Sequence, residues 1–174
     1  MHRFLHGSSS RSQGVSLSWC LATALLLGST QAWAAPACRS VQGSASLTPA
    51  PDCTSPVGIC GMGTFTGGLH GEYSSELFTL TPSADTDVTQ VVFFTAETTM
   101  PAAQVGSWRG QLVLKEAGSF HVAGAGEFAE LYSVAGGTGD FAAATGVLRA
   151  VGTFVDPIGG SILYLGQICV PDHP

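Results

Sequence analysis

Charged side chains are scarce in this 174-residue chain: Asp, Glu, Lys and Arg make up 10% of the residues, and only 6 residues are Lys or Arg. Because 12 residues are acidic, the formal net charge is −6 at pH 7. An acidic chain with so few bases cannot neutralise many phosphates. Neither nucleic acid nor an anionic membrane surface is therefore an expected partner.

Long apolar runs are also missing. The run from Leu17 to Gly28 is shorter than the roughly 18 to 20 residues that a membrane-spanning helix needs. It follows a polar stretch with two arginines and precedes Ala32-Trp33-Ala34, which is the order of a cleavable secretory signal. We predict that residues 1–34 are a signal peptide and that the mature protein is secreted or periplasmic, with no membrane span.

Cysteine is rare, with 5 residues in the chain, and Cys20 would leave with the signal peptide. Four cysteines would remain: Cys38, Cys53, Cys60 and Cys169. An even set in an exported protein is typical of two disulfides. The chain has no C-x-x-C pair, which disfavours a zinc site, and we expect neither a metal nor another cofactor.

No amphipathic helical pattern follows Cys60; short runs of β-branched and aromatic residues alternate with turn residues, which indicates an all-β fold. Strands are predicted near 61–66, 69–81, 88–99, 107–116, 119–126, 128–135, 146–155 and 161–170, with a possible extra strand at 40–47. The short links favour an antiparallel meander, and closure into an eight-stranded barrel would remove its two exposed edges. Residues 35–58, rich in Pro, Ser and Ala, are interpreted as a disulfide-tethered lead-in to a barrel domain at 59–174.

Barrel closure bears on the pairing of the four cysteines. If the strand after Cys60 closes against the final strand, Cys60–Cys169 is the favoured bond and Cys38–Cys53 follows by elimination. If residues 40–47 form the seam strand instead, the pairing becomes Cys53–Cys60 with Cys38–Cys169. Both arrangements remain open at this point.

A glycine-rich turn near the C-terminus carries a family resemblance. The segment Gly136-Gly137-Thr138-Gly139-Asp140-Phe141 is followed by Ala144-Thr145-Gly146 and the strand 147–154. This arrangement resembles the C-terminal half of dirigent proteins and of allene oxide cyclase-like barrels, over roughly residues 105–170. The resemblance implies an eight-stranded antiparallel barrel around an apolar cavity, with Phe141 plugging one end. Motifs that carry the active-site residues of dirigent barrels are absent, so no catalytic residue is implied.

Strand alternation predicts which residues face the interior. Four are expected to be buried and are possible cavity-lining residues: Phe94, Leu112, Phe154 and Tyr164. The last strand is apolar on both faces, so its outer face should be covered by a subunit interface or by the N-terminal segment. A homo-oligomer is therefore possible.

Three carboxylates lie in apolar strand contexts: Glu97, Glu127 and Glu130. If one points into a cavity, desolvation should raise its pKa and make it a plausible acid or base for a cyclisation or isomerisation. No G-x-S-x-G or H-E-x-x-H motif is present to indicate a hydrolase.

Other polar residues are interpreted as surface positions. His70, Glu72 and Glu76 share one strand face, which is more typical of a solvated face than of a metal site. His121, Arg109 and Arg149 likewise alternate with apolar neighbours and are expected to face outward.

Two functions follow as hypotheses. The first is an exported barrel that binds a small, largely apolar molecule in its cavity and possibly steers its cyclisation or coupling without a cofactor. The second is a structural or protein-interaction barrel whose interior is filled by its own side chains. A cavity of roughly 300 Å³ or more with a few convergent polar groups would favour the first.

Overall fold

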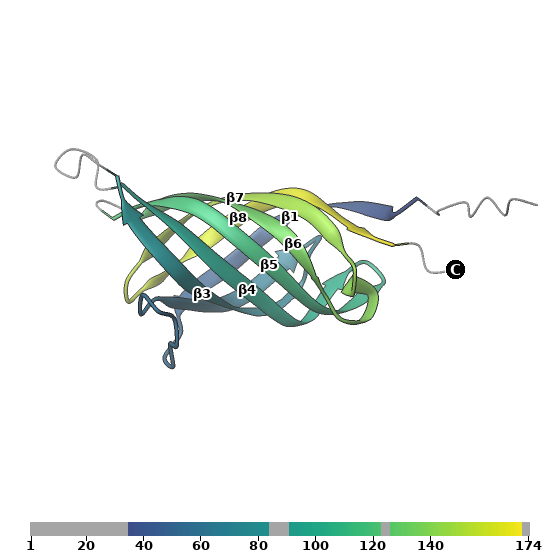
Figure 1. The fold of residues 1–174 in the computed structure, drawn as a ribbon, viewed down its shortest axis with the longest axis horizontal. Coiled ribbons are helices and arrows are strands. Elements are labelled where there is room, and N and C mark those ends of the chain that lie inside the picture. Colours follow the sequence, from purple (N-terminus) through teal and green to yellow (C-terminus); the bar gives the residue numbers. More distant parts are fainter. Residues whose placement is uncertain (1–34, 84–90, 123–125, 172–174) are drawn as a thin grey trace, which may run out of the picture. The chain divides into compact units, whose positions relative to one another are not determined.

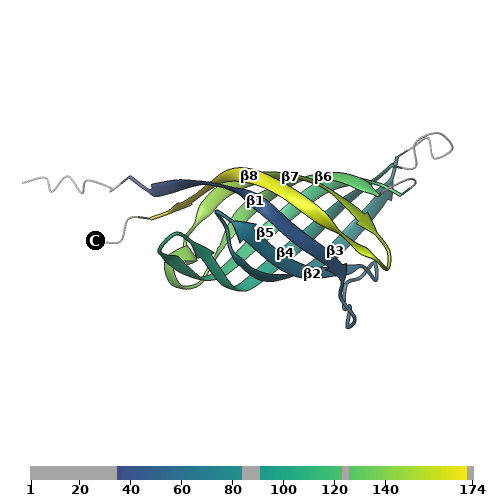
Figure 2. The same cartoon turned by 180° about the vertical axis from the view of Figure 1, so that it is seen from behind.

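The computed structural model describes residues 35–83, 91–122 and 126–171, and the predicted signal peptide lies outside this part. Eight strands form a closed antiparallel barrel in which each strand pairs with its neighbours in sequence and β1 pairs with β8 (Figures 1 and 2). The strands are β1 (Ala37–Pro49), β2 (Cys60–Gly67), β3 (Gly71–Pro82), β4 (Val91–Val105), β5 (Trp108–His121), β6 (Glu127–Gly137), β7 (Thr145–Val155) and β8 (Gly159–Val170), and η1 (Gly139–Phe141) is a short 3₁₀ helix. The predicted all-β fold with an eight-stranded antiparallel barrel is confirmed.

The predicted number of strands is right, but two of the observed strands, β5 and β1, differ from the predicted ones. One continuous strand, β5, replaces the predicted pair 107–116 and 119–126. Gly118, which falls between the two predicted strands, lies within the sheet, opposite Phe94 on β4 and Glu130 on β6. A Cβ at this glycine would come within 2.7 Å of the Phe94 ring and 2.8 Å of the Glu130 Cβ. Gly118 therefore provides space inside the barrel rather than a turn.

The eighth strand comes from the predicted lead-in, because β1 lies between β2 and β8 and extends the barrel to residue 37. In the register of β1 and β8, Cys38 lies directly opposite Cys169. The disulfides are Cys38–Cys169 and Cys53–Cys60. The favoured prediction, Cys60–Cys169 with Cys38–Cys53, is wrong because β1 and not β2 closes the seam against β8.

One half of the barrel interior is filled by side chains. Its fully buried residues include Phe65, Leu69, Met100, Leu112, Leu148 and Ile168. Phe141 of η1 is also completely buried and packs into this core, as the sequence predicts. The Phe65 ring packs edge-on against Tyr73 and Tyr164, with ring centroids 5.0 and 5.2 Å away.

The outer face of β6, β7 and β8 exposes a group of apolar side chains: Leu131, Val147, Val151, Leu163 and Leu165. Across the strands, Val151 lies opposite Leu163, and Arg149 separates Leu131 from Leu165. The N-terminal segment, one of the two expected covers, contributes β1 beside β8 instead. In the described ranges, no helix is long and apolar enough to cross a membrane.

Candidate functional site

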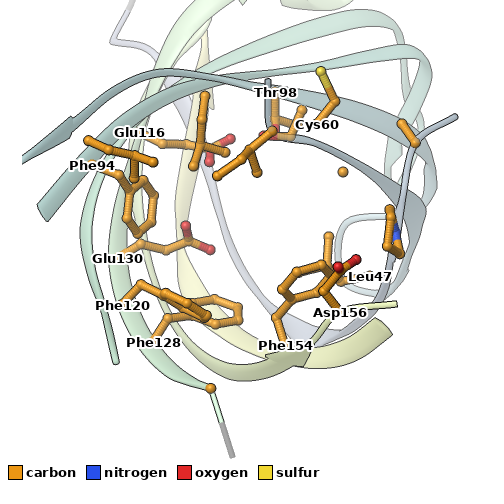
Figure 3. Close-up of a pocket in the computed structure, with 18 of the residues that line it drawn as sticks. Leu47, Cys60, Phe94, Thr98, Glu116, Phe120, Phe128, Glu130, Phe154 and Asp156 are labelled. Atoms are coloured by element: carbon orange, nitrogen blue, oxygen red, sulfur yellow. The ribbon is translucent and has the colours of Figure 1, made fainter. Parts of the chain in front are cut away.

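A cavity of about 650 Å³ occupies the half of the barrel at which β1, β3, β5 and β7 end (Figure 3). Most of its lining is apolar, including Leu47, Leu77, Phe120, Phe128 and Ile162. The Cys53–Cys60 disulfide lies at its edge and holds the segment that joins β1 to β2. The volume is within the range of small-molecule sites.

Two carboxyl groups project into this cavity from adjacent strands (Figure 3). Glu116 on β5 lies opposite Tyr132 on β6, and Gly118 on β5 lies opposite Glu130 on β6. Glu116 and Glu130 are therefore diagonal neighbours on one face of the sheet, within reach of each other's charge. The missing side chain at Gly118 leaves room for the Glu130 side chain.

Glu116 is the more enclosed of the two, with 7% of its surface exposed. Burial and then the charge of Glu130 raise its pKa to about 8, although hydrogen bonds with Thr98 and Ser75 act in the opposite direction. Its Oε1 atom is buried without a hydrogen-bond partner among the described residues. This carboxyl group therefore keeps its proton to a higher pH than an ordinary glutamate does.

Glu130 is half-buried and keeps some exposure. Burial raises its pKa to about 7, and the hydrogen bond donated by the Tyr132 hydroxyl limits that rise. Burial and the two carboxylates raise the pKa of both Tyr73 and Tyr132, so these phenols remain protonated donors in the physiological range. The cavity thus combines two carboxyl groups of raised pKa with two phenols.

The structure places only one of the three predicted carboxylates in the cavity. Glu130 lies there, whereas Glu97 is on the outer face of β4 in an ion pair with Lys115. Glu127 is exposed, and its Oε2 lies 3.4 Å from Nδ1 of His121. Successive side chains of a strand point to opposite faces. Glu97 therefore points away from the face of its buried neighbour Thr98, and Glu127 points away from the face of its buried neighbour Phe128.

The sequence prediction missed Glu116. Alternation along β5 places Glu116 on the same inward face as Leu112 and Leu114. This two-residue period in the sequence could have predicted that Glu116 points into the barrel. Of the predicted lining residues, Phe94 and Phe154 do border the cavity. Leu112 and Tyr164 are buried in the filled half instead.

Phe154, expected to be buried, is only partly so, since the cavity lies beside it. Tyr164 has a structural role: its hydroxyl accepts a hydrogen bond from the Leu69 N–H at 2.9 Å and lies 2.9 Å from the carbonyl oxygens of Thr66 and Leu69. This contact ties β8 to the link between β2 and β3.

The polar residues interpreted as surface positions lie outside the cavity. His70 and Glu72 are exposed, and Glu76 accepts a hydrogen bond from Thr54 at 3.0 Å. Arg109 and Arg149 are exposed as predicted, and His121 is partly exposed. In the part of the chain that the structure describes, no three His, Cys, Asp or Glu side chains gather in a group that could hold a metal ion.

No protein-family model matches the chain, and neither the curated proteins nor the solved structures give a significant match. The resemblance to dirigent and allene oxide cyclase-like barrels thus stays a prediction.

Proposed function

We propose that this protein binds a small, largely apolar molecule in the open half of the barrel. The observation that carries the proposal is the cavity of about 650 Å³, whose apolar wall is interrupted by the paired carboxyl groups of Glu116 and Glu130. Apolar pockets with a few convergent polar groups are the usual form of small-molecule sites. Phe94, Phe128 and Phe154 would contact the apolar body of the ligand, and the two carboxyl groups would contact its polar group.

The carboxyl pair also supports the idea that the ligand is isomerised or cyclised. Burial raises the pKa of both carboxyl groups, and more so for Glu116, so near neutral pH one can donate a proton while the other accepts one. Such a reaction conserves the atoms of the substrate and requires no cofactor.

Export from the cytosol is part of the proposal. The two disulfides are typical of an oxidising compartment, which agrees with a secreted or periplasmic protein.

The glycine-rich turn that carries the family resemblance has positive φ at Gly136 and Gly139, a conformation that glycine adopts readily.

A matched pair of substitutions on β4 tests ligand binding. Val92 lines the cavity, and its neighbour Phe93 is on the outer face with 53% of its surface exposed. Titration with a neutral hydrocarbon fluorophore, 1,6-diphenylhexatriene, should give saturable binding. Val92→Trp should weaken that binding by about tenfold or more, whereas Phe93→Trp should leave it unchanged. Equal effects of the two substitutions, or no saturable binding, would contradict the proposal.

The exposed apolar face of β6 to β8 favours a second candidate, a barrel that associates with a second copy of itself. Leu163 and Leu165 are 63% and 59% exposed on this face. Such patches commonly mark protein contacts. Sedimentation equilibrium should then show a dimer that Leu163→Glu dissociates, and a monomeric wild-type protein would exclude this function.

A further inference from the structure

We infer that the preferred ligand is a protonated amine with an apolar body, whose ammonium group lies between Glu116 and Glu130. This inference rests on the proposed binding function and specifies its ligand class. It starts from a charge imbalance inside the barrel.

The cavity has acidic groups without a counter-charge. Among the described residues that line it, none is Lys, Arg or His, whereas Glu116, Glu130 and Asp156 are acidic. The nearest basic residue along β5, Lys115, points outward and pairs with Glu97. A carboxylate buried without a positive partner is costly. A bound ammonium group would provide the missing partner.

The enclosure of Glu116 strengthens this point. The residue is 7% exposed, its side chain points into the cavity (Figure 3), and its Oε1 has no hydrogen-bond partner in the described part of the chain. Ammonium groups donate up to three hydrogen bonds and accept none, which suits a wall composed of carboxyl and hydroxyl oxygens. Ser75 and Thr98 add two hydroxyl groups to that wall.

Aromatic rings lie beside the carboxyl groups. Tyr73 and Tyr132 line the same part of the cavity, and Phe94, Phe128 and Phe154 line the rest. Ring faces attract cations, and they also bury the apolar part of an amine. An acidic chain also attracts cations from solution over a longer range.

Other ligand charges fit less well. A carboxylate ligand would bring its negative charge into a cavity whose described lining has acidic groups and no basic side chain, and it would oppose the ionisation of Glu116 and Glu130. A neutral ligand can bind, but it leaves the carboxyl groups without a cation. Only a cation allows both to ionise in place.

The inference has a definite pH dependence. The polar and titratable groups around the pair are Tyr132 on β6, Tyr73 and Ser75 on β3 and Thr98 on β4, and the charge of Glu97 on the outer face of β4 also raises the pKa of Glu116. Asp156, after β7, lines the same cavity, and the described lining residues of β1, β2 and β8 have no free titratable side chain. A bound ammonium lowers the pKa of both carboxyl groups, so that binding releases protons. Amine affinity should therefore rise between about pH 6 and pH 8.5.

Three isosteric probes test the ligand class: 3-phenylpropylamine, 3-phenylpropan-1-ol and 3-phenylpropanoate. Calorimetric titration at pH 8 should show the amine binding at least about tenfold more tightly than the alcohol, and the acid binding most weakly. Titrations in buffers of different ionisation enthalpy should show proton release with the amine alone.

Two variants localise the effect. Glu116→Gln combined with Glu130→Gln should abolish the preference for the amine over the alcohol, whereas Glu127→Gln, on the outer face of the same β6 strand, should preserve it. Because the double variant removes two buried acids, it is expected to fold, and circular dichroism would check this. If the alcohol binds as tightly as the amine, or the double variant retains the preference, the inference is wrong. If the amine inference fails but diphenylhexatriene still shows saturable binding, the proposed small-molecule binding function is unaffected. If diphenylhexatriene shows no saturable binding either, both the inference and the proposed function are wrong.

Discussion

The two halves of the barrel are built from the same eight strands with the same alternation, but one half is filled and the other is hollow. In the filled half the inward residues are large, such as Phe65, Leu112 and Leu148, and η1 adds Phe141 as a plug. In the hollow half several inward positions are glycine or a small polar residue, including Gly118 and Gly152. The cavity lies in the half where the inward side chains leave the centre of the barrel unfilled.

The glycines of the hollow half have a second effect. A Cβ at Gly152 would lie 2.6 Å from the Phe128 ring, as one at Gly118 would lie 2.7 Å from the Phe94 ring. Each ring therefore packs across a glycine on the neighbouring strand. The wall stays apolar while the centre stays open.

The two disulfides provide the largest contrast between the halves. Cys38–Cys169 closes a loop with a sequence separation of 131 at the filled end, whereas Cys53–Cys60 spans a separation of 7 at the cavity mouth. On the chain-entropy model, replacing both cysteines of the first bond by alanine should cost about 5 kcal/mol, and the same change in the second about 2.5 kcal/mol. Urea denaturation of the two double variants would measure the difference, and equal losses would contradict it.

The second largest expected difference between the halves is the loss of stability when a large inward side chain is replaced by alanine. Leu148 is fully buried in the filled half, so Leu148→Ala should cost about 2 to 5 kcal/mol. Phe154 borders the cavity and is only partly buried, so Phe154→Ala should cost less than Leu148→Ala despite removing more atoms. The free energies of unfolding in urea compare them directly. A larger loss at Phe154 would show that the hollow half is closed in solution.

The raised pKa values make the hollow half sensitive to pH. Glu116 has a pKa of about 8 in the folded protein and an ordinary value near 4.5 when unfolded. The folded state thus binds the extra proton between these values, and stability falls as pH rises through that window. The loss should be on the order of a few kcal/mol between about pH 5 and pH 9.

Glu116→Gln removes this titration, so the variant should be more stable than the wild type at about pH 8.5 and closer to it at about pH 5. Thermal unfolding at both pH values would show the change. Glu72→Gln is the outward control, since Glu72 is exposed on β3 and does not line the cavity. A wild type whose stability is flat across this range would mean that water reaches Glu116 freely.

The sequence predicted the barrel fold better than it predicted the seam, the disulfide pairing and the extent of β5. Alternation and turn residues were sufficient for an all-β barrel, because a period of two assigns each side chain to one face. Glu130 was one of three carboxylates chosen for their apolar neighbours, and the other two, Glu97 and Glu127, lie outside the cavity. The seam was left between two strands, because β1 is rich in Ser and Ala and its inward residues are mostly small. The favoured seam and its disulfide pairing were wrong, and the alternative, with a strand at 40–47, is the one that the structure shows. The predicted break between 107–116 and 119–126 was wrong because Gly118, which falls in that gap, lies inside β5 opposite Phe94 and Glu130. A glycine in a strand and a glycine in a turn look alike in the sequence, and only the neighbouring strands distinguish them.

Gly118 also offers the finest test of the comparison. A Cβ there would meet the Ala129 carbonyl oxygen at 2.6 Å as well as Phe94 and Glu130, so Gly118→Ala should cost about 1 to 3 kcal/mol through overpacking. The outward neighbour Ala117 is exposed, so Ala117→Ser should change stability by less than about 0.5 kcal/mol. Because the added methyl group would displace the Phe94 ring or the Glu130 side chain toward the cavity, Gly118→Ala should also weaken diphenylhexatriene binding, whereas Ala117→Ser should not. Urea unfolding and the fluorescence titration measure the two effects on the same samples. If Gly118→Ala is neutral in both, the glycine is not what keeps this half of the barrel open.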